Sequence, residues 1–66
     1  MRLLKKYPNR RIYDTQTRQF VTLSDIRQMI NEREEFQVLH SKSGNDMTRS
    51  VLIQIITEME AEGHES

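Results

Sequence analysis

The stretch RRIYDTQTRQFVTL, Arg10–Leu23, decides the fold because it reads as two short strands joined by a polar turn. The segments RRIYD and QFVTL flank TQTR, a loop of hairpin length without the Asn-Gly signal of a tight two-residue turn. Side chains alternate between the faces of a strand, so Ile12 is expected on the face opposite Arg11 and Tyr13. The stretch therefore predicts a β-hairpin.

A basic arm precedes this hairpin. Pro8 directs Tyr7 toward extended backbone and, together with Asn9, favours a bend. The arm is therefore expected to turn before the first strand begins, so that arm and hairpin together cover about residues 3–23.

The segment TLSDIRQMINER, which overlaps the end of the hairpin, has the pattern of a helix with a defined start. Thr22 and Asp25 have the spacing of a capping box, and Ser24 is a rival N-cap. Apolar residues then recur at helical spacing along one stripe: Leu23, Ile26, Met29 and Ile30. The segment predicts a helix over about residues 23–33.

The rest of the chain reads as a strand followed by a longer helix. FQVLHSK alternates and predicts a strand over about residues 36–42, after which SGND supplies a turn. Asp46 or Thr48 can cap a second helix over about residues 46–61. The sequence thus predicts one small α+β domain over residues 1–66, with the element order ββαβα.

The charge of the chain is balanced overall but divided between its two parts. Residues 1–18 hold six basic residues against Asp14 alone, which gives a net charge of +5. Residues 19–66 hold four basic residues against nine acidic ones, which gives −5. Such asymmetry favours a surface for a polyanion, most often nucleic acid. A basic segment can equally be a solvated face or pair with acidic residues of a neighbouring subunit.

The length of the chain makes self-association the expected extra source of stability. A domain of 66 residues buries only about 60% of the surface that its unfolded chain exposes, and this chain has no cysteine for disulfides. The second helix has more apolar surface than a lone small domain needs, and part of it would cover the sheet. We expect a homodimer or higher oligomer whose interface draws on Val51, Leu52, Ile55, Ile56 and Met59.

Catalytic and metal sites have little support in the sequence. His40 and His64 lack the spacing of a zinc site, and no cysteine completes one. The serines lack a glycine-flanked strand-to-helix setting, and two glycines offer no phosphate-cradling loop. No enzyme activity, metal or cofactor is therefore expected. Without an apolar run of about 20 residues or a signal-like stretch after MRLLKK, a cytoplasmic setting without membrane contact is expected.

The string KYPNRRIYDT, followed by FVTLSDI, by F-x-V at 36–38 and by DMTRSVL-x-QI, resembles one bacterial family over about residues 3–57. The sequence is similar to the N-terminal DNA-binding domain of the polyhydroxyalkanoate synthesis repressor (PhaR) family, also called polyhydroxybutyrate accumulation regulators. The most specific part of the resemblance consists of Lys6, Tyr7, Asn9, Arg10, Arg11, Tyr13, Asp14 and Thr15. Ile12 stands where such sequences more often have leucine, and Pro8 occupies a variable position.

The resemblance implies a cytoplasmic transcriptional repressor that controls genes for polyhydroxyalkanoate synthesis and for granule-associated phasins. Its partner would be operator DNA, which it would release when polymer or granules accumulate. In that family a second region follows the DNA-binding domain. Contact with polyhydroxyalkanoate polymer is therefore expected of the full-length protein only.

The residues and the resemblance point to the same DNA-binding candidates. These are Lys5, Lys6, Tyr7, Asn9, Arg10, Arg11, Tyr13 and Arg18. The lysines suit phosphate contact alone, whereas Arg10 and Arg11 can contact phosphates or guanine edges. Each of these residues can also have a structural role. The tyrosines can line the core with their hydroxyl groups in water, Asn9 can turn the backbone, and either arginine can pair with Asp14.

Two other functions are compatible with the sequence. An oligomerisation or protein-interaction module would use the apolar second helix and show no salt-sensitive duplex binding. An RNA-binding module needs aromatic rings on an open sheet, and four aromatic residues spread along the chain supply little of that. Because a strand separates the two helices, a basic arm or β-ribbon is expected to read the DNA, and not a helix-turn-helix.

Overall fold

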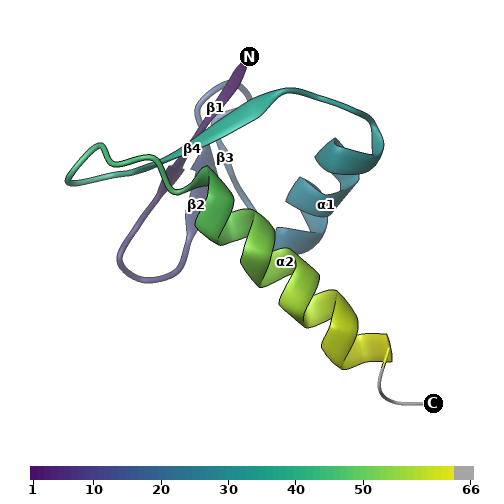
Figure 1. Cartoon of the computed structure of the whole chain (residues 1–66). Helices are drawn as coiled ribbons and strands as arrows, with labels where there is room; N and C mark the ends of the chain where they lie inside the picture. Colours follow the sequence, from purple (N-terminus) through teal and green to yellow (C-terminus); the bar gives the residue numbers. More distant parts are fainter. Residues whose placement is uncertain (64–66) are drawn as a thin grey trace.

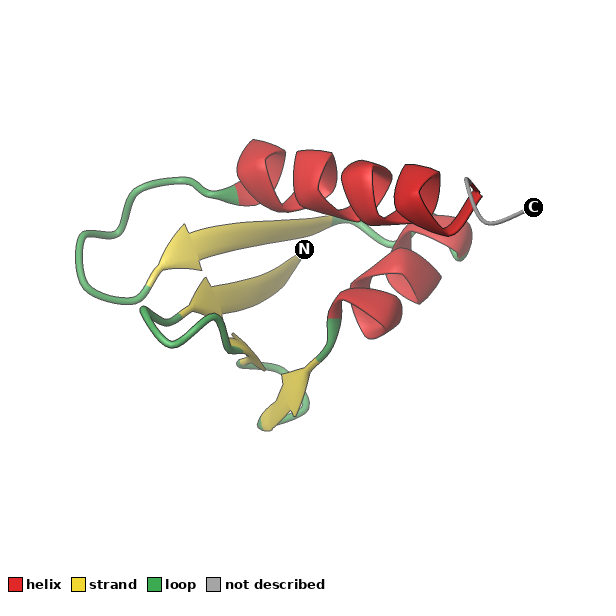
Figure 2. Ribbon diagram, turned by 90° about the horizontal axis from the view of Figure 1, so that it is seen from below, coloured by secondary structure: helices red, strands yellow, loops and turns green. Residues whose placement is uncertain are grey.

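The computed structural model describes residues 1–63, with side chains described through residue 60, and places two helices against one face of a four-stranded sheet (Figure 1, Figure 2). The elements follow in the order β1 Arg2–Lys6, β2 Ile12–Asp14, β3 Gln19–Val21, α1 Leu23–Asn31, β4 Phe36–His40 and α2 Thr48–Gly63. The predicted α+β class and the order of hairpin, helix, strand and helix are confirmed. His64 lies outside the described residues.

The segment expected to be a basic arm is instead a strand, β1, in the interior of the sheet. The strand order is β3-β2-β1-β4, with β1 antiparallel to β2 and parallel to β4. Leu4 in the middle of β1 is fully buried, and its partners across the sheet are Asp14 and Val38. The Leu4 side chain fills the core, and its burial takes the backbone of β1 out of water. The backbone N–H and C=O groups of β1 are therefore satisfied by pairing with β2 on one side and β4 on the other.

The β1–β2 turn gives Pro8 and Asn9 their roles. The Arg10 N–H donates to the Tyr7 carbonyl at 3.1 Å, and the Tyr7 N–H donates to the Arg11 carbonyl at 2.8 Å. The Asn9 side chain accepts from the Arg11 N–H at 3.1 Å, so Asn9 turns the backbone. Arg10 has a φ of 68° and is the left-handed residue that closes a three-residue hairpin loop.

Helix α1 has the predicted start. The Thr22 hydroxyl accepts from the Asp25 N–H at 3.1 Å, and the Asp25 carboxylate accepts from the Thr22 N–H at 2.9 Å, which completes the capping box. The helix ends at Asn31, and the Arg33 N–H donates back to the Ile30 carbonyl at 3.0 Å. Arg33 has a φ of 58°, the left-handed conformation that commonly closes a helix, so α1 stops earlier than expected.

The core lies between the helices and one face of the sheet. Its buried side chains are Leu4, Ile12, Ile26, Met29, Val38, Val51 and Ile55. Val51 and Ile55, which we expected at an oligomer interface, therefore pack inside the domain because α2 turns this side toward the sheet. Leu52 is half-buried, while Ile56 and Met59 are exposed. Of the five residues that we expected at an oligomer interface, these three are left with side chains accessible to a second copy.

Candidate nucleic-acid interface

Cations gather at the end of the sheet where β1 finishes. We call Lys5, Lys6, Arg10, Arg11 and Lys42 the basic end. The first two end β1, and the two arginines belong to the turn that follows it. The Ser41 N–H donates to the Lys6 carbonyl at 2.8 Å, which brings the loop carrying Lys42 to the same end of the sheet (Figure 1). Sequence reasoning missed Lys42 because only the parallel pairing of β1 with β4 places it there.

Arg10 occupies a conformation that an arginine adopts at a cost. Its φ of 68° lies in the left-handed region, which costs a residue with a side chain about 1–2 kcal/mol. The side chain is exposed, and it makes no hydrogen bond or ion pair with another described residue. The Arg10 side chain lines a groove together with Lys6 of β1 and Gln54 of α2. The positive φ of Arg10 closes the β1–β2 turn, and its exposed guanidinium is available to a ligand outside the domain.

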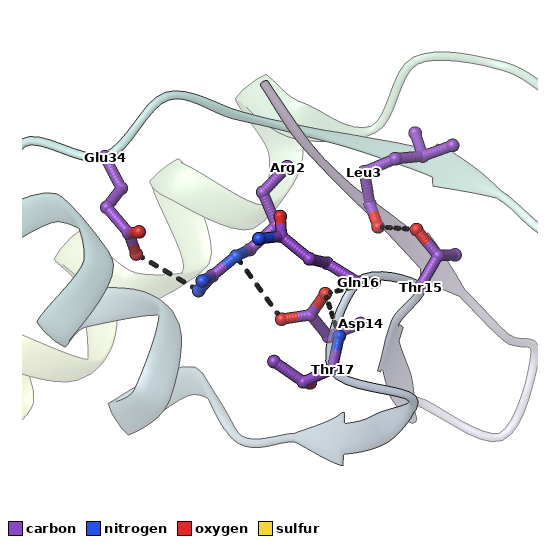
Figure 3. Close-up of polar contacts among 7 residues, drawn as sticks. All are labelled: Arg2, Leu3, Asp14, Thr15, Gln16, Thr17 and Glu34. Carbon is purple, nitrogen blue, oxygen red and sulfur yellow. Dashed lines mark hydrogen bonds and ion pairs between the residues drawn. The ribbon is translucent and has the colours of Figure 1, made fainter.

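Asp14, in contrast, has a structural role. It is 1% exposed, and its Oδ1 accepts from the Gln16 N–H at 2.8 Å (Figure 3). Its Oδ2 lies 3.5 Å from Arg2 Nε, and Arg2 also reaches Glu34 at 3.1 Å. The proposed pairing of Asp14 with an arginine of the β1–β2 turn is wrong, because Asp14 faces the helices and binds Arg2. Arg2 is therefore a cation held within the domain.

The β2–β3 turn carries Arg18 away from the basic end. The Thr15 hydroxyl donates to the Leu3 carbonyl at 2.7 Å, which fixes this turn beside the beginning of β1 (Figure 3). The Arg18 N–H donates to the Asp14 carbonyl at 2.8 Å, and Arg18 has a φ of 61°. The sheet therefore separates Arg18 from the other candidates. Those at or beside the basic end are Lys5, Lys6, Tyr7, Asn9, Arg10 and Arg11.

The remaining candidate, Tyr13, lies on the face of the sheet opposite the helices. One row of register partners crosses this open face: Phe20, Tyr13, Lys5 and Leu39. The ring centroid of Phe20 lies 5.3 Å from that of Tyr13 and 6.2 Å from that of Tyr7. The Arg11 guanidinium carbon lies 5.4 Å from the Phe20 centroid. Three aromatic residues that are spread along the sequence thus meet on an open sheet. This corrects our expectation that the aromatic residues of the chain supply few rings to such a face.

Acidic residues lie mainly away from the basic end. Glu32, Glu34 and Glu35 follow α1 and precede the start of β4. Glu58 and Glu60 lie in the C-terminal half of α2. The basic end adjoins the last residues of β1 and β4, so these carboxylates are separated from it in space.

The loop between β4 and α2 is fixed by two polar side chains. His40 Nδ1 accepts from the Lys42 N–H at 3.1 Å and from the Ser43 N–H at 3.3 Å. Hydrogen bonds lower the pKa of Asp46. The largest contribution comes from the Thr48 hydroxyl, the next from the Thr48 N–H, which lies 2.9 Å from Asp46 Oδ1, and the smallest from the Gln37 amide. Among the described side chains, those of residues 1–60, no group of three or more His, Cys, Asp and Glu is placed to hold a metal ion. Within residues 1–63 no helix is long and apolar enough to cross a membrane.

A second surface lies between the two helices. We call Ile30, Leu52, Ile56 and Met59 the apolar groove. Ile30, Ile56 and Met59 are each exposed despite their apolar side chains. Arg27 and Asn31 of α1 line the same groove. None of the residues that line this groove belongs to the basic end.

The described residues form a small α+β domain with a group of cations at one end of its sheet. The model of one family, described as the PHB/PHA accumulation regulator DNA-binding domain, matches residues 3–63. The chain belongs to this family, which is one of DNA-binding regulators and not of enzymes. The resemblance based on the motif at Lys6–Thr15 is thereby confirmed.

Two curated relatives resemble the chain over most of its length. An uncharacterized protein of Allochromatium vinosum is 47% identical over 62 residues, which are 94% of this chain and 40% of that protein. A Thiocystis violacea protein, described as an uncharacterized protein in the phbA 5′ region, is 44% identical over 62 residues, 94% of this chain and 45% of that protein. The chain therefore spans less than half the length of these relatives. No solved structure matches it.

Proposed function

We propose that the domain binds operator duplex DNA through the basic end, as the DNA-binding part of a cytoplasmic repressor of polyhydroxyalkanoate synthesis and phasin genes. The observation that carries the proposal is the basic end itself, where cations of β1, of the β1–β2 turn and of the loop after β4 meet and the Arg10 side chain is exposed. The name of the Thiocystis violacea relative, which refers to the phbA 5′ region, supports the link to such genes. The proposal includes no catalytic step.

The tip of the sheet is the part that would approach the duplex. The turn between β1 and β2 joins two antiparallel strands, which β4 and β3 flank, and this turn would enter the major groove, about 12 Å wide. Lys5, Lys6 and Lys42 would contact phosphates, and these contacts position the domain without reading sequence. Arg10 and Arg11 at the tip can contact phosphates or the acceptor edge of guanine. Arg2 contributes to neither role because Asp14 and Glu34 hold it.

Salt-dependent binding tests the basic end directly. A bound duplex is first selected from a random library, and its affinity is then measured by fluorescence anisotropy at several salt concentrations. If each of the cations of the basic end neutralises one phosphate, log affinity should fall against log salt with a slope of about −4.5 per domain.

Arg10→Ala should make that slope shallower by about 0.9. Arg33→Ala is the matched control, because Arg33 is also an exposed arginine with positive φ, but it closes α1. Its slope should equal that of the wild type. Equal slopes for all three proteins would place the duplex elsewhere, and a wild type without salt-sensitive binding would favour the oligomerisation module.

We also propose that the apolar groove joins two copies of the chain. Ile30, Ile56 and Met59 are exposed in a domain without disulfides, and covering them would add stability to a small core. A two-fold dimer would duplicate the basic end and suit an operator with two-fold symmetry. Release of the operator on contact with accumulated polymer is proposed only for the longer proteins of this family.

A further inference from the structure

The open face of the sheet leaves a large aromatic ring exposed. Both helices pack on the other face, and no other element within residues 1–63 covers this one (Figure 2). Phe20 keeps 54% of its surface exposed although it contacts Tyr7 and Tyr13. Its register partners continue across the sheet to Lys5 and Leu39. The core of the domain therefore gives no reason for an aromatic residue at this position.

The rings are arranged so that a flat group can stack on them. Tyr7 and Tyr13 meet Phe20 edge-on, at interplanar angles of 61° and 75°, so neither ring lies flat on Phe20. The planar guanidinium of Arg11 lies over the Phe20 ring and presents a second flat surface. Unpaired bases stack on such surfaces whatever their sequence, because every base has a π face.

Charge decides between the possible occupants. Lys5 and Arg11 accompany the rings, and the row from Phe20 to Leu39 contains no carboxylate. Asp46 lies at the far edge beyond β4, where it is hydrogen-bonded to the Gln37 amide. A second copy docked on this face by a two-fold axis would bring the same cations together, which repels. A polyanion complements the face.

We propose that the open face binds an unpaired strand of DNA, with bases stacked on Phe20 and Arg11 and phosphates beside Lys5. The inference goes beyond duplex recognition, because the faces of paired bases are covered by their neighbours in the stack and cannot reach Phe20. DNA is favoured over RNA because the chain belongs to a family of DNA-binding regulators.

Two substitutions of Phe20 test the proposal in the folded chain. The chain has no tryptophan, so Phe20→Trp places a single indole in the row. An oligothymidine of about 12 nucleotides should quench its fluorescence as bases stack on it. Phe20→Leu keeps an apolar side chain but has no ring, and it should weaken oligothymidine binding about tenfold or more. Its salt slope for the selected duplex should equal that of the wild type, since the substitution removes no cation.

Each alternative gives a different result. Unchanged oligothymidine affinity in Phe20→Leu, or no quenching in a Phe20→Trp variant that circular dichroism shows to be folded, would overturn the proposal. Preference for oligouridine by about tenfold would assign the face to RNA and overturn the choice of DNA. Loss of self-association in Phe20→Leu, without oligothymidine binding by the wild type, would assign the face to a second copy. The duplex measurement separates all these outcomes from failure of the basic end.

Discussion

Replacing Arg10 by glycine should raise the stability of the domain while it lowers the affinity for DNA. At a φ of 68°, a residue with a side chain costs about 1–2 kcal/mol that glycine avoids. Glycine loses about 0.5–1 kcal/mol of this gain because its unfolded backbone is more flexible. The net gain lies between about 0 and 1.5 kcal/mol, which corresponds to at most about 12 °C in Tm for a domain of this size. The backbone hydrogen bonds of the turn are available to glycine.

The same substitution removes one cation from the basic end. We expect the salt dependence of duplex affinity to become shallower by about 0.9, as for Arg10→Ala. An additional loss of about 1–3 kcal/mol for the selected duplex over a scrambled one would show that Arg10 reads a base. Arg10→Ala should lose the same affinity without the gain in Tm, because alanine retains the backbone strain.

Arg33→Gly separates the two effects. Arg33 is exposed with a φ of 58° at the end of α1, so glycine should relieve the same backbone strain there. This variant should melt at a higher temperature but bind the duplex like the wild type. Circular dichroism melts and anisotropy titrations measure both quantities. A lower Tm for Arg10→Gly would show that its guanidinium holds the fold, and equal losses of affinity in both glycine variants would mean that only net charge matters.

Three further predictions concern the polar turns and the apolar groove. Asp14→Ala should lower the free energy of unfolding in urea by about 2–4 kcal/mol, because it removes a buried acceptor and leaves Arg2 short of a partner; a loss below about 1 kcal/mol would contradict this role. Because its pKa is lowered in the folded state, ionised Asp46 stabilises the fold above about pH 4, and this stabilisation is lost as the pH falls through the folded-state pKa. Asp46→Asn should therefore lower the free energy of unfolding more at neutral pH than at about pH 3, and a loss that does not depend on pH would refute the prediction. Ile56→Glu should reduce the mass measured by sedimentation equilibrium whereas Gln54→Glu, outside the groove, should not, and a monomeric wild type at high concentration would end the dimer proposal.

The features that the sequence predicted well depend on residues close together in the chain. The capping box needs only Thr22 and Asp25, and the turn of β2 into β3 needs only the residues between two short strands. The family could likewise be recognised from one string of residues, Lys6–Thr15. Each of these signals is local, so no knowledge of the tertiary fold was required.

The features that were missed depend on pairing between distant segments. β1 is too short and too basic to be distinguished from an arm, and only the burial of Leu4 between two strands reveals its position. The same pairing brings Lys42 to the basic end and turns Asp14 toward Arg2. The aromatic cluster around Phe20 follows from register, which a single-residue shift would reverse.

The interior position of β1 also determines when the domain can fold during its synthesis. β1, β2 and β3 pair across short loops, so this meander can form as soon as it leaves the ribosome. The parallel partner β4 is made only after α1, and its pairing with β1 must close a much longer loop. Val51 and Ile55 of α2 emerge later still, so the part of the apolar face that α1 does not cover stays exposed until the last helix has been translated.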